Sequence, residues 1–316
     1  MSKWKLSIGT AGAVGLRKLK TNALPTTAYI MLGEKCTRNC AFCAQAREST
    51  AAAKFLSRVV WQEVPEDNAI ESIKDAYIKG KIQRACLQVV NRPDSLSVVK
   101  NAIEELTKAK VPVVVSGYIT SVEEAGELLN LGADRLGIAM DVATPELFTK
   151  IKGGSWEKRW NLISSCARAY PGKITTHLIV GLGETEKEMF ETIKLCYKEG
   201  ITVGLFAFTP LKGTAMEKSN PPDIKRYRRL QIALGLLKKG IKAENIICDD
   251  EEIIRCDASN AQELLSDGDC FRTSGCDNCN RPFYNERPGQ ILYDYPWKLS
   301  EEEVEEALKM SEVEFC

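Results

Sequence analysis

The chain of 316 residues contains a single histidine, His177, and no apolar run near the ~20 residues that span a bilayer. Its basic N-terminus lacks the uninterrupted apolar stretch of a signal peptide, so we expect a cytoplasmic protein that does not enter a membrane. A net charge is also absent, because 43 Lys and Arg side chains balance 43 Asp and Glu side chains. We therefore expect no nucleic-acid partner, since surfaces that track phosphates concentrate positive charge.

Cysteine is the unusual feature of this composition. The 12 cysteines are too few for a disulfide scaffold of this length, yet six of them fall in two short segments. The six are Cys36, Cys40 and Cys43 in the first segment and Cys270, Cys276 and Cys279 in the second. In a cytoplasmic chain such grouping indicates metal ligation. We expect Cys86, Cys166 and Cys196 to be small buried side chains or incidental thiols.

Six short apolar runs alternate with amphipathic segments. Each is typical of a buried parallel strand, because it is rich in β-branched residues and bounded by Gly, Pro or polar turns. The runs are 28–33, 85–90, 111–116, 135–139, 174–181 and 203–208. Helix starts between them are marked by Ser121 with Glu124, by Thr185 with Glu188, and by Thr144 before a proline. The pattern predicts an α/β fold, a partial (β/α)6 TIM-like barrel with its active-site groups at the carboxyl ends of the strands.

Four parts of the chain differ in character. We expect an N-terminal extension over 1–24, the barrel over 25–245, and an irregular Cys-rich extension over 246–296 that needs something other than an apolar core. Residues 297–316 predict a terminal acidic helix, which begins with a capping box and carries one narrow apolar stripe. That helix is expected to present a solvated face, to dock a partner subunit, or to cover a metal centre in the Cys-rich segment.

The first cysteine segment has the spacing C-x3-C-x2-C and directly follows the first predicted strand. Three thiolates leave one iron of a [4Fe-4S] cluster open for a substrate or cofactor, whereas structural zinc sites, the alternative, usually close all four positions. With Phe42 before its third cysteine, the motif resembles the signature of the radical S-adenosylmethionine superfamily. The resemblance implies that cofactor cleavage releases a 5′-deoxyadenosyl radical. It also implies catalytic cluster ligands, which are Cys36, Cys40 and Cys43.

A second motif, at 177–184, resembles the superfamily's G-x-I-x-G-x-x-E segment. His177 stands where glycine is usual, so it is expected either to contact a ligand or to be a packed core imidazole. Glu184 matches the motif, but it could equally be an exposed carboxylate in the first turn of a helix. The superfamily's Gly-Gly-Glu after the second strand is replaced by Val-Asn-Arg-Pro at 90–93. The residues that we predict to bind the cofactor are Phe42, Asn91, Ser116, Asp141, His177, Gly181 and Glu184.

The second cysteine segment places three thiols within ten residues of a core-poor region. This spacing predicts a metal centre at Cys270, Cys276 and Cys279, in which Gly275 allows the turn that aims Cys276 back toward Cys270. We expect a second [4Fe-4S] cluster, with Ser274 as a catalytic oxygen ligand that is easier to displace than a thiolate. Structural zinc is the alternative, completed by Cys248, Cys256 or Cys316.

A barrel with an auxiliary cluster resembles the sulfur-inserting enzymes biotin synthase and lipoyl synthase. Biotin synthase takes its auxiliary ligands from barrel strands, where this chain has only Cys86. Lipoyl synthase uses three cysteines outside the barrel, at another spacing and nearer the N-terminus. Five segments resemble the biotin-synthase-related group that provides the archaeal-type, two-subunit lipoyl synthase, namely 9–11, 27–31, 36–47, 56–59 and 273–288.

That resemblance implies sulfur insertion into a protein-bound octanoyl chain, with the auxiliary cluster as sulfur donor. The implied cofactors are S-adenosylmethionine and two [4Fe-4S] clusters. The implied partners are a second radical lipoyl synthase subunit, an octanoylated lipoyl-carrier protein or domain, and an electron donor such as a ferredoxin. Two alternatives remain, namely an enzyme whose second cluster only relays electrons, and a non-catalytic iron–sulfur or zinc protein that uses the barrel as a scaffold.

Overall fold

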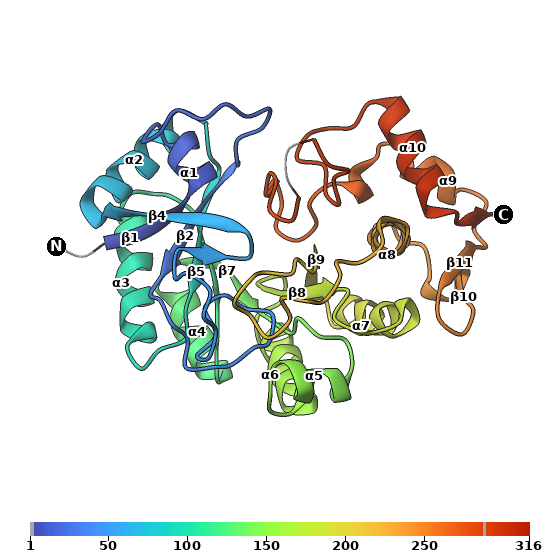
Figure 1. Ribbon diagram of the computed structural model, residues 1–316, viewed down its shortest axis with the longest axis horizontal. Coiled ribbons are helices and arrows are strands. Elements are labelled where there is room, and N and C mark those ends of the chain that lie inside the picture. The colour runs from blue at the N-terminus through green and yellow to red at the C-terminus, as the bar shows by residue number, and fades with distance from the viewer. Residues whose placement is uncertain (1–2, 287–288) are drawn as a thin grey trace.

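A curved sheet of nine strands forms the centre of the computed structural model, which describes residues 3–286 and 289–316 (Figure 1). The strand order is β3-β4-β1-β2-β5-β6-β7-β8-β9, and the six strands from β2 to β9 are parallel. These six are β2 (Thr27–Leu32), β5 (Arg84–Val89), β6 (Val113–Gly117), β7 (Ala133–Ile138), β8 (Ile174–Val180) and β9 (Thr202–Ala207). The sheet curls into a half-barrel, which confirms the fold class predicted from the sequence.

The six apolar runs became parallel strands because both faces of this sheet are covered. In β2 every residue is buried, so the strand has no polar face to alternate with its apolar one. Helices cover the outer face of the half-barrel (Figure 1). They are α2 (Glu66–Ile78), α3 (Ser95–Lys108), α4 (Val122–Asn130), α5 (Pro145–Ile151), α6 (Trp156–Ala169), α7 (Glu186–Lys198) and α8 (Ile224–Lys238). No helix in the described part of the chain is long and apolar enough to cross a membrane.

Three predicted helix starts lie at the positions expected from the sequence. Ser121, Thr144 and Thr185 each accept a hydrogen bond from a backbone N–H of the first turn. The capping box of Thr185 with Glu188 is complete. At α4 the Glu124 carboxylate accepts the N–H of Thr120 at 2.9 Å, one residue before the cap, so that box is only half formed.

The N-terminal residues belong to the sheet. β1 (Lys3–Ser7) lies between β2 and β4 (Val59–Pro65) and runs antiparallel to both. It is followed by α1 (Ile8–Ala13), and β3 (Phe55–Leu56) forms a hairpin with β4. No continuous apolar run marks β1 in the sequence, because this strand alternates lysine with buried residues such as Leu6, as an antiparallel strand with one polar face does.

The Cys-rich extension contains only short elements. β10 (Ile246–Cys248), β11 (Ile253–Cys256) and β12 (Glu314–Phe315) form a separate three-stranded sheet. Between β11 and the terminal helix lie α9 (Ala261–Leu265) and the short 3-10 helix η2 (Asp269–Phe271), and another, η1 (Ala243–Asn245), precedes β10. These elements lie beside α8 at one end of the molecule (Figure 1).

The terminal helix α10 (Glu301–Ser311) has the predicted capping box of Ser300 with Glu303. It packs on α8, and Val304 and Ala307 of its apolar stripe are buried there (Figure 1). Its acidic face remains exposed. Because its apolar stripe is already covered within the chain, this stripe is not free to dock a partner.

Residues 272–286 bridge the two ends of the parallel half-barrel. Beside β2, the Asn280 side chain accepts the N–H of Thr26 at 2.9 Å and donates to the carbonyl of Leu24 at 3.0 Å. Beside β9, the Asn285 side chain donates to the carbonyl of Ala207 at 2.6 Å. The extension is therefore fixed to the first and the last parallel strand, and it covers the inside of the half-barrel.

We expect Asn280→Ala to loosen this extension. The change leaves the N–H of Thr26 and two carbonyls without their partner, which is expected to lower the free energy of unfolding by about 1–3 kcal/mol. Limited proteolysis of the metal-free protein should then cut within 272–286 earlier than in the parent chain. Asn22→Ala, at an exposed position, is the matched control and should change neither readout. Equal proteolysis of the Asn280 variant and the parent would contradict this role.

Candidate functional site

The first cysteine loop lies between β2 and β3, at the carboxyl end of β2. Gln45 holds the loop in shape, because its buried side chain donates to the carbonyls of Ala53 at 2.8 Å and Phe55 at 2.7 Å. The backbone carbonyl of Gln45 also accepts the N–H of Cys36 at 2.7 Å. These hydrogen bonds join the two ends of the cysteine loop to the segment that leads into β3.

The three thiols of this loop line one cavity of about 220 Å³, which we call the mouth cavity. Five of the seven predicted cofactor residues line the same cavity, namely Phe42, Asn91, Ser116, Asp141 and His177. Asn91 also fixes the loop, since its side chain donates to Thr37 Oγ1 at 2.8 Å and its carbonyl accepts the N–H of Thr37 at 2.9 Å. The carboxyl ends of neighbouring parallel strands therefore gather these residues, as a barrel requires.

Burial and positive charge have opposite effects on the thiols of the mouth cavity. Burial raises the pKa of Cys40 and raises that of Cys43 to about 12. Lys152 and Arg38, which line the same cavity, lower the pKa of Cys40. Buried thiols that ionise only beside a cation are suited to bind a metal cluster, because the metal supplies the missing positive charge.

The Arg38 side chain lines the mouth cavity and is held by hydrogen bonds. Arg38 donates from its terminal nitrogens to Tyr118 Oη at 2.9 Å and to the carbonyl of Lys152 at 3.0 Å. Its Nε is buried and makes no hydrogen bond with the described residues. A buried donor without a partner costs free energy, so the described residues satisfy this guanidinium only in part.

Asp141 and Lys152 form a buried ion pair at the wall of the mouth cavity. Lys152 Nζ lies 2.6 Å from Asp141 Oδ2, and it also donates to the carbonyls of Ala139 at 2.9 Å and Met140 at 3.0 Å. Asp141 has a left-handed backbone (φ 65°), which aspartate tolerates, and it continues the β7–β8 pairing through hydrogen bonds with His177 and Ile179. The pair thus fixes the position of one carboxylate oxygen and leaves a charged wall for a ligand.

Gly181 and Glu184 do not line the mouth cavity. They also line neither of two further cavities that adjoin it and that are described below. The Glu184 carboxylate accepts the N–H of Gly181 at 2.8 Å and of Leu182 at 2.9 Å, and it pairs with Arg226 at 2.6 Å. Burial raises the pKa of Glu184, whereas Arg226 and the backbone hydrogen bonds lower it. A Cβ at Gly181 would lie 2.9 Å from Pro222 Cδ, so the glycine allows a close approach of backbone to backbone. Both residues shape the turn between β8 and α7, and their contact with a cofactor stays a prediction.

His177 lies on β8 with its ring in edge contact with Phe206 at 5.0 Å. Burial lowers its pKa from 6.5 to about 4, so the imidazole is neutral at neutral pH. The ring lines three neighbouring cavities, of which the mouth cavity is one. Of the two roles predicted for this residue, the position beside the cavities favours contact with a ligand.

The lowered pKa of His177 makes stability depend on pH in a predictable direction. Between pH 6.5 and about 4 the unfolded chain binds a proton that the folded chain excludes, so stability present above pH 6.5 is lost as the pH falls. The loss is at most about 3 kcal/mol. Urea unfolding of metal-free protein should show a weaker pH dependence in His177→Gln than in the parent. Identical pH dependence in the two proteins would contradict the buried, neutral imidazole.

The second cysteine segment is divided by the fold. Cys276, Cys279 and Ser274 line a cavity of about 60 Å³ inside the half-barrel, which we call the inner cavity. Cys270 does not line it. Its Cβ instead lies 2.5 Å from the place that a Cβ on Gly235 of α8 would occupy, and burial raises its pKa to about 12. The structure therefore brings Cys276 and Cys279 together but leaves Cys270 against α8, because η2 packs on that helix.

The other predicted ligands of the second centre lie elsewhere. The Ser274 hydroxyl accepts the N–H of Leu205 at 2.7 Å, so its oxygen already has a structural partner. Cys248 and Cys256 are in the separate small sheet, and Cys316 directly follows β12 and donates its N–H to the carbonyl of Cys256 at 3.2 Å. None of these three cysteines lines the inner cavity. Residues 287–288, part of a segment that carried the family resemblance, lie outside the described residues.

Several residues of the site escaped the sequence analysis. Gln88 of β5 lines the mouth and inner cavities as well as a third, which lies against Phe206 and Tyr284. Its signal was a single amide within the apolar run of β5. Cys86 was recognised as the only cysteine of a predicted barrel strand but was expected to be a buried or incidental thiol, and Arg281 and Tyr284 had no local signal. Their place in the site depends on the packing of the C-terminal extension against the strands.

The third cavity lies against Phe206 and Tyr284, and we call it the middle cavity. It measures about 150 Å³, and its polar lining residues are Cys43, Ser57, Gln88, Asp141, His177, Thr209, Tyr284 and Asn285. The apolar residues that line it are Phe42, Leu56, Ile179, Phe206, Ala207 and Phe208. Gln88 and His177 line all three cavities, so the mouth, middle and inner cavities meet at these two side chains.

The thiols share cavities, but their sulfur atoms stand apart. Among residues 3–286 and 289–316, no three His, Cys, Asp or Glu side chains are gathered closely enough to hold a metal ion as they stand. This holds for Cys36, Cys40 and Cys43 as well as for the thiols of the inner cavity. Binding of a cluster therefore requires the thiols of either group to close on it.

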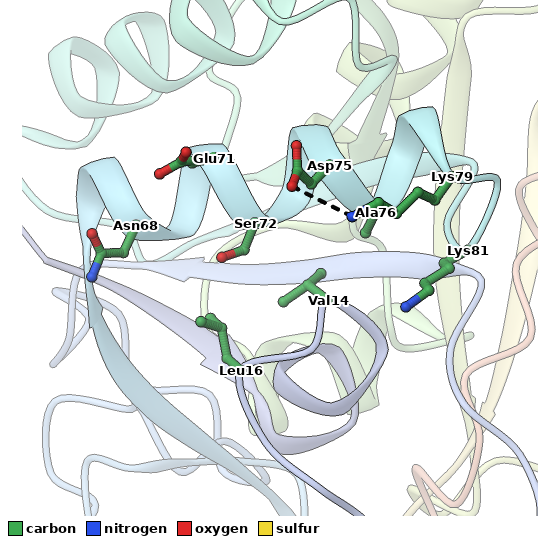
Figure 2. Close-up of a pocket in the computed structure, with 9 residues that line it drawn as sticks. All are labelled: Val14, Leu16, Asn68, Glu71, Ser72, Asp75, Ala76, Lys79 and Lys81. Carbon is green, nitrogen blue, oxygen red and sulfur yellow. Dashed lines mark ion pairs between the residues drawn. The ribbon is translucent and has the colours of Figure 1, made fainter.

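A separate surface pocket has different chemistry. It lies between α2 and the turn after α1, and it is lined by side chains such as Val14, Leu16 and Glu71 (Figure 2). Its ion pair joins Lys79 to Asp75, one turn apart on α2, at 3.6 Å. No cysteine of the described residues lines this pocket, so it is not part of the candidate site.

The profile of the family described as the radical SAM superfamily matches residues 30–196, more than half of the chain. The lipoyl synthase of Colwellia psychrerythraea is 27% identical over 207 residues, which are 63% of this chain and 61% of that protein. The lipoyl synthase of Buchnera aphidicola subsp. Schizaphis graminum is 24% identical over 222 residues, 66% of each chain. The match to these two relatives thus spans less than two thirds of their length.

Solved structures with low sequence identity share the fold. Methylornithine synthase (PylB) aligns with a TM-score of 0.53 at 16% identity, over 66% of this chain and 62% of that chain. The FeFe-hydrogenase maturase HydG from Carboxydothermus hydrogenoformans aligns with a TM-score of 0.53 at 17% identity, over 75% of this chain and 55% of that chain. Identities this low establish the common fold and nothing about the reaction.

Proposed function

Because this chain belongs to the radical S-adenosylmethionine superfamily, we propose that it inserts sulfur into a protein-bound octanoyl chain, as part of a lipoyl synthase. Its curated relatives named lipoyl synthase support a lipoyl synthase-like activity. One observation carries the finer proposal. The thiols of the mouth cavity and those of the inner cavity lie on either side of Gln88 and His177, with the middle cavity beside them. A radical centre and a sulfur source need this kind of shared chamber.

The mouth cavity fits the superfamily's cofactors. Cys36, Cys40 and Cys43 would hold the [4Fe-4S] cluster, and three thiols leave one iron position for S-adenosylmethionine. The Arg38 guanidinium and the fixed Asp141 carboxylate line this cavity and are suited to the carboxylate and the amino group of that molecule. When bound, cluster and cofactor supply a carbon radical strong enough to abstract hydrogen from an unactivated methylene.

The residues around the chamber position the substrate and exclude water. The aromatic and aliphatic side chains of the middle cavity, such as Phe42, Leu56 and Phe208, suit an alkyl chain, because they offer it apolar contacts. Neutral His177 can donate or accept one hydrogen bond there without bringing a charge into the chamber. Phe206 and Tyr284, in edge contact at 5.8 Å, close the side that faces the C-terminal extension.

The proposal includes the partners that such a reaction needs. These are a second radical lipoyl synthase subunit, an octanoylated lipoyl-carrier protein or domain, and a low-potential electron donor such as a ferredoxin. Two sulfur atoms have to be inserted at two carbons, and division of the two insertions between two related subunits would account for a second subunit. The second cluster would be the sulfur donor.

Turnover by the anaerobically reconstituted chain tests this function. The protein, with and without the second subunit, is incubated with S-adenosylmethionine, a reductant and an octanoylated carrier protein. We expect 5′-deoxyadenosine together with a carrier that has gained sulfur, at about one insertion per chain because the donor is consumed. Many turnovers without loss of sulfide would favour an electron-relay cluster instead. Cofactor cleavage without sulfur in the carrier would overturn the proposal.

A further inference from the structure

A third thiol lies beside Cys276 and Cys279, and it comes from the barrel itself. Cys86 is the third residue of β5, where it stands in register with Tyr29 of β2. Cys86, Cys276, Cys279 and Tyr29 all line the inner cavity. The expectation that Cys86 is only a small buried side chain or an incidental thiol took no account of the extension that packs over β5.

The thiols of the inner cavity influence one another electrostatically. Burial raises the pKa of Cys86, and the charges of Cys276 and Cys279 raise it further. The pKa of Cys276 is raised by burial and then by Cys279. The charges that act on Cys270 belong to other residues, chiefly Lys239, Asp267 and Arg228. Cys86 is therefore a neighbour of the other two thiols, and Cys270 is not.

Both outer thiols of this group have a hydrogen-bond partner. Gln88 Nε2 donates to Cys86 Sγ at 3.0 Å, and Tyr29 Oη lies at the same distance from Cys279 Sγ. Hydrogen bonds to sulfur stabilise thiolates and tune the clusters that thiolates hold. Because Gln88 also lines the mouth cavity, the same side chain lies between the two groups of cysteines.

One guanidinium, that of Arg281, lines the inner cavity, and two others act on its thiols from farther away. Arg84, Arg135 and Arg281 each lower the pKa of Cys276. Arg281 is held in place, since it donates to the carbonyl of Ser274 at 3.0 Å and its guanidinium lies 3.7 Å from the centre of the Phe206 ring. Guanidinium groups in these positions offset the negative charge of a cluster that is held by three thiolates.

The loop that carries Cys276 and Cys279 is built into the barrel. Gly275 has a left-handed backbone (φ 106°), and a Cβ there would lie 3.4 Å from Gly204 Cα on β9. The missing side chains of both glycines let the loop lie directly on the strand. The hydrogen bond from the N–H of Leu205 to Ser274 fixes it there. These contacts determine which strand residues the two thiols meet.

We propose that Cys86, Cys276 and Cys279 are the protein ligands of an iron–sulfur cluster inside the half-barrel, and that Cys270 is a packing residue of α8. The site joins one cysteine of a barrel strand to two of the extension, so it has the ligand set of neither biotin synthase nor lipoyl synthase. Binding replaces three thiol protons by bonds from sulfur to iron. The role of this cluster as sulfur donor rests on the proposed function, but its ligands can be identified without turnover.

Metal content tests the ligand set. All variants carry Cys36, Cys40 and Cys43 replaced by alanine, so that only the second centre is measured after anaerobic reconstitution with iron and sulfide. This parent variant should hold about four iron per chain, with matching sulfide. Adding Cys86→Ala should reduce iron to less than about one per chain, whereas adding Cys270→Ala should leave it unchanged.

Two further variants separate ligation from folding. Cys196→Ala changes a buried cysteine of α7 whose pKa is shifted by burial alone, with no influence from another thiol, and it should keep the cluster. Cys86→Ser nearly preserves the volume of the side chain, so it should not disturb packing. If Cys86 is a ligand, this variant should either hold a cluster with an altered spectrum or lose the cluster while the chain stays folded. The proposal is overturned if Cys86→Ala keeps its iron, if Cys270→Ala loses it, or if the parent variant binds only zinc. A retained cluster without sulfur insertion would overturn the proposed function alone.

Discussion

A Cys40→Ala variant is expected to cleave S-adenosylmethionine at least about a thousandfold more slowly than the parent chain, because a cluster with two thiolate ligands in this loop cannot bind and reduce the cofactor. Cys40 lines the mouth cavity beside Lys152 and Arg38, and Cys36 and Cys43 are the other cysteines of the described residues that line it. The measurement is 5′-deoxyadenosine formed per chain under anaerobic, reducing conditions, with iron content determined on the same sample.

The control for this variant is Cys166→Ala. Cys166 is buried in α6 and lines none of the three cavities, so its replacement should leave both cofactor cleavage and iron content unchanged. Cofactor cleavage by Cys40→Ala at the parent rate would show that the C-x3-C-x2-C loop is not the radical centre. Loss of iron from Cys166→Ala as well would indicate unfolding rather than a missing ligand.

Lys152→Met is expected to lower the free energy of unfolding by about 3–5 kcal/mol, because it leaves the Asp141 carboxylate buried without its partner. The pair is 2.6 Å apart, with 7% of the Lys152 side chain and 12% of the Asp141 side chain exposed. Two backbone carbonyls also lose the donor that they share. Urea unfolding of the metal-free, reduced protein measures the effect.

A second substitution separates loss of the ion pair from loss of packing. Asp141→Asn added to Lys152→Met removes the unpaired charge, and asparagine tolerates the left-handed backbone at this position. The double variant should therefore be more stable than Lys152→Met alone. Lys150→Met, at an exposed position of the same helix, should change stability by less than about 0.5 kcal/mol. A double variant no more stable than Lys152→Met would mean that the charge of Asp141 is not what destabilises the single variant.

Structural features that depend on residues close together in the chain could be predicted from the sequence. Parallel strands buried on both faces must be apolar along their whole length, so six runs of such residues were enough to indicate six strands of a half-barrel. The caps at Thr185 and Ser300 are formed by residues three positions apart. The C-x3-C-x2-C loop is also local, since all its thiols follow one strand. β1 escaped because a strand with one polar face has no long apolar run.

Contacts between distant segments could not be predicted in this way. Lys152 directly follows α5 and pairs with Asp141, which precedes that helix, and the residues next to Lys152 in the sequence do not mark it as buried. Glu184 matches a family motif, yet its carboxylate is fully bonded to the turn and to Arg226, which lies 42 residues later. Such contacts depend on how the elements pack.

The sequence by itself determined the superfamily's cysteine loop and the half-barrel, because each depends on residue spacing along one segment. Only the tertiary structure decided which thiols share the inner cavity. Proximity in the chain favoured Cys270 as the partner of Cys276 and Cys279, but η2 packs Cys270 on α8 while Gly275 and Gly204 let the loop turn into the barrel toward Cys86. Cys86 and Cys276 lie 190 positions apart in the chain, so only the folded structure lets them line the same cavity.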